Sequence, residues 1–213
     1  RIDVFDAVAA LFSVFRDLHQ AQAQWGGRFD PEAEGLHPAA IGWINDFRGI
    51  AAFHASDFGR AVSFLTRSYQ AAMETGQLRR ATSIATNIGN AFTGLNARHA
   101  ALEWMQRGLD LARPTGWPMC IGLGLMQSAE TLRQLGQRDA AAELLAEALA
   151  TLAPLPNSRA YAITLEYLGD LALDVGDHER ALDSFRQLEV RGDALRQADF
   201  RSGARRGQAH ALS

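Results

Sequence analysis

Apolar residues recur every three or four positions along most of the chain, the spacing of an amphipathic α-helix. In the first stretch, Phe5, Val8, Leu11 and Phe15 share one face, and the pattern predicts one long helix over residues 2–24. The segment that follows, GGRFDPEAEGLHP, is interrupted by glycine and proline and predicts an irregular loop. Residues 1–38 are therefore expected to form an N-terminal helix plus loop, or the second half of a degenerate first repeat.

From residue 39 the helical pattern becomes regular and predicts antiparallel pairs joined by short turns. Breaker segments, GQ, PTGWP, PLPNS and RGD, separate one pair from the next. The predicted pairs cover residues 39–75, 78–113, 119–153 and 158–190, and a half-repeat covers 193–213.

Small residues return at a fixed spacing of 40 residues, which indicates an internal repeat. One series is Gly49, Gly89, Ala129 and Gly169, with Ala209 expected to continue it, and the other is Ala61, Ala101, Ala141 and Ala181. Two helices joined by a tight turn must touch, and a large side chain at the crossing would push their axes beyond about 8–10 Å. The two series therefore predict the crossing points of the pairs.

These residues resemble the tetratricopeptide repeat family over residues 39–213. The segments NIGNAF, LRQLGQRDAAAELLAEAL and YLGDLALDVGDHERALDSF are similar to family repeats. The usual period is ~34 residues, and the longer spacing resembles the subgroup of LGN-type scaffolds and MalT-like bacterial regulators. It is also similar to the N-terminal repeat regions of bacterial diguanylate cyclases. The resemblance implies an all-α fold, a right-handed α-solenoid superhelix of antiparallel helix pairs.

The resemblance also implies where a ligand binds, because family members hold ligands on a concave face lined by the first helix of each pair. Amides on this face hold a peptide backbone, which needs a donor and an acceptor at once. The residues expected there are Trp43, Asp46, Asn87, Asn90, Gln127, Glu130, Arg133, Glu166, Tyr167 and Asp170. The basic clamp that some members use for a terminal carboxylate is not matched, which argues against a chaperone-tail adaptor.

Two charged stripes admit two interpretations each. Glu166, Asp170 and Asp174 recur every four residues on one helix, and they form either a site for a basic partner or a solvated face, which is favoured. The C-terminal arginines form either a nucleic-acid site or the solvated side of the last helix. The net charge of −3 favours the solvated side and argues against nucleic acid.

Other motifs argue against chemistry in this segment. No HExxH or CxxC pattern supports a metal site, and Gly122 and Gly124 read as helix packing, without the third glycine of a nucleotide-binding turn. No catalytic constellation or cofactor site is predicted. A single cysteine and the lack of a membrane-length apolar run favour a cytoplasmic protein. All 21 basic residues are arginine, which suggests a bacterial genome rich in GC.

The expected function is therefore that of a non-catalytic, protein- or peptide-binding module. We expect it to be the sensory or regulatory part of a larger bacterial signalling protein, such as a GGDEF diguanylate cyclase, with an output domain following Ser213. The alternatives are the ligand-sensing region of a MalT-like transcriptional regulator and a stand-alone oligomeric scaffold, so a homo-oligomer is also considered.

Overall fold

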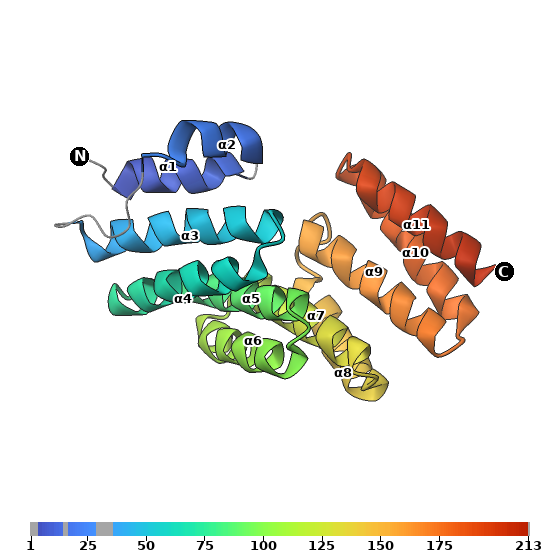
Figure 1. Cartoon of the computed structure of the whole chain (residues 1–213). Helices are drawn as coiled ribbons and strands as arrows, with labels where there is room; N and C mark the ends of the chain where they lie inside the picture. Colours follow the sequence, from blue (N-terminus) through green and yellow to red (C-terminus); the bar gives the residue numbers. More distant parts are fainter. Residues whose placement is uncertain (1–3, 15–16, 29–35, 213) are drawn as a thin grey trace. The chain divides into compact units, whose positions relative to one another are not determined.

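The computed structural model describes residues 4–14, 17–28 and 36–212. Within these ranges the regular structure is entirely helical, as the sequence predicts. The chain divides into two compact units, Arg1–Thr115 and Gly116–Ser213. Each unit is built of antiparallel helix pairs, whose order along the chain can be traced in Figure 1 by the colours from blue to red. No helix in the described residues is long and apolar enough to cross a membrane.

The described residues of the first unit form six α-helices and a short 3-10 turn. Its helices α3 to α6 form two successive pairs, and α1 packs along α3 (Figure 1). The elements are α1 (Val4–Val14), α2 (Leu18–Trp25), α3 (Pro38–His54), α4 (Phe58–Glu74), α5 (Leu78–Gly94), α6 (Arg98–Ala112) and η1 (Arg113–Thr115).

The prediction of one long helix over residues 2–24 is wrong. The first helix ends at Val14 and a second begins at Leu18, after Asp17 has taken an extended backbone conformation (φ −157°). The Asp17 carboxylate accepts a hydrogen bond from the Gln20 backbone N–H at 3.0 Å. Such a cap satisfies one of the unpaired N–H groups at the start of a helix. Asp17 therefore favours a new helix start at Leu18, although the apolar pattern continues across this position.

Residues 116–212, the described part of the second unit, form five α-helices. These are α7 (Pro118–Gln134), α8 (Arg138–Leu152), α9 (Arg159–Asp174), α10 (His178–Ala194) and α11 (Ala198–Ala211). The helices α3, α5, α7 and α9 each begin within one residue of the start of a predicted pair. The apolar core of this unit includes Leu165, Phe185 and Leu188, all nearly inaccessible to solvent.

The end of the second unit differs from the prediction in two ways. The RGD segment does not end the helix as predicted, because α10 continues through Gly192 to Ala194 and the turn comes after Ala194. A side chain at Gly192 would meet the first turn of α11, since a Cβ there would lie 3.1 Å from the Arg201 backbone nitrogen. Ala209 does not continue the small-residue series either: it is exposed, and Gly207 faces the Phe185 ring instead.

The small residues lie at the crossings of the helix pairs, and the structure identifies their partners. A Cβ added at Gly49 would lie 2.6 Å from Leu65, one at Gly89 2.7 Å from Met105, and one at Gly169 2.6 Å from Phe185. Each glycine therefore leaves room for the large side chain that comes 16 positions later in the next helix. The alanines of the second series are completely buried.

The turns carry a signal with half the period of the pairs. Residues with positive φ occur every 20 positions, at Ser56, Gly76, Asn96, Gly116, Gly136, Gly176 and Arg196. A left-handed residue after a helix lets the chain reverse, and glycine adopts it without strain. Position 156 is the exception in this series, because proline cannot adopt a positive φ.

Candidate functional site

In the first unit, Trp43 and Asp46 are held by an arginine that the sequence analysis missed. The Nε and Nη2 atoms of Arg80, on α5, each lie 3.4 Å from Asp46 Oδ2. The same guanidinium stacks 3.9 Å from the centre of the Trp43 ring, and its Nη2 donates to Ser68 Oγ at 2.9 Å. Because the side chains of Arg80 and Asp46 are only 9% and 7% exposed, the Asp46 carboxylate is bonded inside the unit rather than presented to solvent.

Burial disfavours both charges of this ion pair. Loss of hydration raises the pKa of Asp46 to about 6, although the neighbouring Arg80 guanidinium works in the opposite direction. Burial likewise lowers the pKa of Arg80, with Asp46 opposing the shift. The attraction between the two groups therefore offsets only part of their desolvation, which is common for buried pairs.

A signal for Arg80 was present in the sequence. Gly42 lies one helical turn before Asp46 on α3, and a Cβ at Gly42 would lie 3.0 Å from Arg80 Nη1. The glycine therefore leaves room for a guanidinium next to a buried carboxylate. The arginine itself is 34 residues further along the chain, so helical periodicity alone could not connect the two.

Asn87 and Asn90 lie on α5. Unlike Asp46, their side chains are not bonded to other residues of the unit. Both side chains are half-buried, and neither amide forms a hydrogen bond with any residue in the described part of the chain. Residues three apart on a helix share a face. The two amides thus offer neighbouring donors and acceptors on one side of α5.

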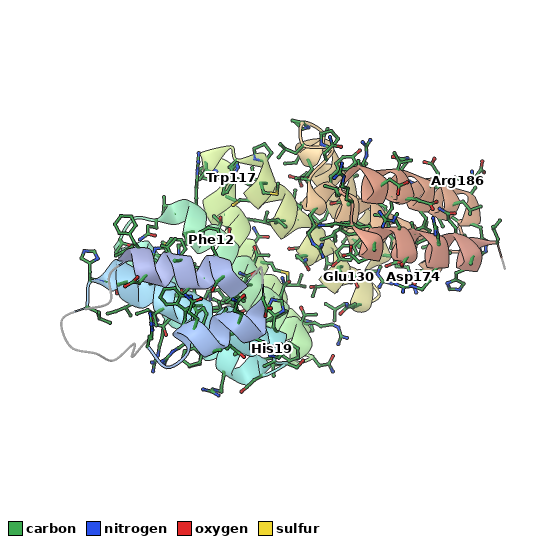
Figure 2. The ribbon with its side chains drawn as sticks, turned by 90° about the horizontal axis from the view of Figure 1, so that it is seen from above. Phe12, His19, Trp117, Glu130, Asp174 and Arg186 are labelled. Carbon is green, nitrogen blue, oxygen red and sulfur yellow. The ribbon has the colours of Figure 1, made fainter. Side chains whose placement is uncertain are left out.

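In the second unit, Arg133 joins the two first helices α7 and α9. Its Nε and Nη2 atoms donate to the two Glu130 carboxylate oxygens at 2.8 and 3.0 Å, and its Nη1 donates to Asp174 Oδ2 at 2.6 Å. Figure 2 shows Glu130 and Asp174 next to each other, as this bridge requires. The hydrogen bond with Glu130 is the main cause of the raised pKa of Arg133, so the guanidinium is firmly charged.

A second contact joins the same helices. Burial together with the nearby Glu130 raises the pKa of Tyr167 to about 12, and the Gln127 side chain next to the hydroxyl opposes the shift. The phenol is thus neutral at physiological pH and keeps its O–H as a donor. Four of the predicted residues, Gln127, Glu130, Arg133 and Tyr167, are in this way linked across α7 and α9.

Glu166 and Asp170 lie on the same face but outside this network. Neither carboxylate has an ion-pair partner within 4.0 Å among the residues that the structure describes. Burial raises the pKa of Glu166, Asp170 adds to the effect, and Arg206 opposes it. Burial also raises the pKa of Asp170, with Arg133 opposing. The structure therefore presents two partly buried, unpaired carboxylates one turn apart.

The predicted residues thus fall into an engaged group and an open group. Trp43, Asp46, Gln127, Glu130, Arg133 and Tyr167 are bound to their neighbours, whereas Asn87, Asn90, Glu166 and Asp170 keep free polar groups. No cluster of histidine, cysteine, aspartate and glutamate able to hold a metal ion occurs in the described ranges.

This arrangement of helix pairs agrees with what comparisons with known proteins show. Residues 122–189, inside the second unit, match the family model described as tetratricopeptide repeat. The fold is that of tetratricopeptide-repeat proteins. A search of the curated proteins gives no match to this chain.

Solved structures with the same fold are distant in sequence. The apo form of RapI is 14% identical with a TM-score of 0.69, over 90% of this chain and 70% of that one. BtubC from P. vanneervenii is 15% identical with a TM-score of 0.66, over 100% of this chain and 88% of that one. The Rap conjugation gene regulator of plasmid pLS20, in complex with the Phr* peptide, is 14% identical with a TM-score of 0.63, over 95% and 64%. At these identities the likeness concerns the tetratricopeptide-repeat fold alone.

Proposed function

We propose that this chain is a protein- or peptide-binding module whose ligand lies on the exposed faces of the first helices. The observation that carries the proposal is the pair of half-buried, unbonded amides of Asn87 and Asn90 on α5. Water satisfies half-buried amides in the free protein, and each amide can both donate to and accept from a peptide bond that displaces this water. A peptide in extended conformation would satisfy them.

The remaining predicted residues take supporting roles in this proposal. Arg80 pairs with Asp46 and stacks on Trp43, and so fixes the start of α5 against α3. In the second unit, the contacts from Gln127 to Tyr167 and from Arg133 to Glu130 hold α7 beside α9. These contacts leave Glu166 and Asp170 open to contact positively charged groups of a ligand. The solved complex of the pLS20 regulator with its Phr* peptide supports the choice of a peptide ligand.

The proposal is tested by selecting ligands without assuming their sequence. A random peptide library displayed on phage is panned against the full chain, and a selected peptide is titrated calorimetrically. We expect the Asn87→Ala and Asn90→Ala variants to bind at least about tenfold more weakly, because each loses two hydrogen bonds to the peptide backbone.

The matched control is Glu143→Gln. Glu143 is exposed and lies on α8, the second helix of its pair, outside the proposed peptide-binding faces. This variant should bind like the parent protein. If panning enriches no peptide, or if the asparagine variants bind as tightly as the control, the proposal is wrong.

We further propose that the module regulates an output domain in a larger bacterial signalling protein. The resemblance to diguanylate-cyclase repeat regions favours a GGDEF domain after Ser213, and a MalT-like transcriptional regulator is the alternative. The sequence of the full gene tests this: a GGDEF domain supports the first and a helix-turn-helix segment the second. A gene without an output domain would favour an oligomeric scaffold, which light scattering would reveal as a stable dimer.

A further inference from the structure

A cavity of about 270 Å³ lies between α3 and α4 in the first unit. It is lined by Pro38, Ile41 and Asn45 from α3 and by Arg67, Ala71 and Glu74 from α4. None of these residues belongs to the peptide-binding faces proposed above. We propose that this cavity binds a small ligand with an ammonium group, of the size of a free amino acid, which donates a hydrogen bond to Asn45.

The amide of Asn45 has a carbonyl without a partner. The residue is 1% exposed, and its Nδ2 donates to the Ile41 backbone carbonyl at 2.9 Å. This bond fixes the orientation of the amide, so Oδ1 is the free end, and it is buried without a hydrogen-bond partner among the described residues. An acceptor left in this state destabilises the folded protein, and a donor entering the cavity would remove this penalty.

The repeat shows that packing alone does not require an asparagine here. Positions 85, 125 and 165, which correspond to 45 at the 40-residue spacing, hold alanine, leucine and leucine, and all three are buried. An apolar side chain is therefore compatible with this place in a helix pair. At position 45 the chain instead places an amide beside a cavity, which is a more costly choice unless a polar group fills it.

The groups around the cavity select the chemical class of the ligand. Because Oδ1 of Asn45 only accepts, the ligand must donate. Glu74, exposed at the rim, adds a negative charge that favours a positively charged donor. A cavity just below the ~300–1,000 Å³ of drug-sized sites suits a molecule as small as an amino acid.

The test is a thermal-shift screen of the full chain against each of the free L-amino acids at millimolar concentration, with their N-acetyl derivatives as controls. We expect at least one amino acid to raise the melting temperature and its N-acetyl derivative, which lacks the ammonium group, to have no effect. Calorimetry of that amino acid with Glu74→Gln should show at least about tenfold weaker binding, because a charged hydrogen-bond acceptor is lost.

Asn45→Leu introduces the residue found at positions 125 and 165. It should abolish the shift in melting temperature, and without ligand the variant should melt no lower than the parent. If no amino acid shifts the parent protein, or if Asn45→Leu and Glu74→Gln retain the full shift, the proposal is wrong. A high-resolution crystal structure with only a water molecule on Asn45 Oδ1 in the presence of the amino acid would also refute it. None of these outcomes depends on a peptide binding to Asn87 and Asn90, so the two proposals can fail separately.

Discussion

Replacing Arg80 with methionine would test whether the Arg80–Asp46 pair holds the first unit together. Methionine keeps much of the apolar stem but removes the guanidinium that contacts Asp46, Trp43 and Ser68. Asp46 would then be left as a buried carboxylate without its partner. Ser68 would keep a hydrogen bond, because its hydroxyl also donates to the Gly42 carbonyl at 2.8 Å.

The expected loss of stability follows from these contacts. Removing one partner of a buried ion pair costs about 3–5 kcal/mol, mostly because the remaining charge is left uncompensated. The stacking on Trp43 adds about 0.5–2 kcal/mol. We therefore expect Arg80→Met to lower the free energy of unfolding by about 3–5 kcal/mol or more at pH 8.

The loss should depend on pH in a defined direction. The pKa of Asp46 is about 6 in the folded protein and 3.8 for a free aspartate side chain. Because the folded state binds the proton more tightly, this group contributes stability that is present below the lower value and is lost as pH rises to about 6. The difference corresponds to about 3 kcal/mol. Without Arg80 the pKa of Asp46 rises further, so Arg80→Met should cost much less at pH 5, where Asp46 is protonated.

The assay is urea unfolding followed by far-UV circular dichroism at pH 5 and pH 8. Arg138→Met, an exposed arginine at the start of α8, is the matched control and should change stability by less than about 0.5 kcal/mol. The double variant Asp46→Leu with Arg80→Met should lose less than the two single variants combined, because no unpaired charge remains. A loss below about 1 kcal/mol that is equal at both pH values would refute this account of the pair.

Three further predictions concern the repeat itself. Gly89→Leu should destabilise the protein by about 1–3 kcal/mol or more, because a Cβ there would already lie 2.7 Å from Met105. Gly59→Ala is the control and should not destabilise it, because a Cβ at Gly59 would have nothing within 4 Å. Equal melting temperatures for the two variants would mean that the crossing is misassigned. Arg196→Gly should stabilise by up to about 1 kcal/mol in chemical denaturation, because Arg196 has a φ of +55°; a loss would show that its side chain matters more than its backbone. Asp57→Ala should cost about 0.5–2 kcal/mol by the same measurement, because its carboxylate caps α4, and Gln137→Ala, at the cap position of α8 without a side-chain capping bond, should be neutral.

The helix pairs could be predicted from sequence because their determinants are local and repeated. Glycine at 49, 89 and 169 and alanine at 61, 101, 141 and 181 record where two helices touch, and the turn residues record where the chain reverses. The break before Leu18 was missed because one capping aspartate decided it. The extension of α10 was missed because Gly192 looks like a breaker in sequence but serves close packing in space.

The candidate site was less accessible to this reasoning. Counting positions from the repeat identified residues that share a helix face, including Asn87 and Asn90, but it could not tell which of them are already bonded. Asp46 forms an ion pair with an arginine from another helix pair, and Arg133 donates its hydrogen bonds to Glu130 and Asp174. Such contacts depend on side-chain reach across helices, which a repeat pattern does not encode.

The most direct test of the central claim is calorimetric titration of a library-selected peptide into the parent protein, the Asn87→Ala and Asn90→Ala double variant and the Glu143→Gln control. The account predicts that the double variant loses binding by about a hundredfold while melting at the parent temperature, and that the control binds like the parent. Equal affinity for all three proteins would contradict it and place the ligand elsewhere on the chain.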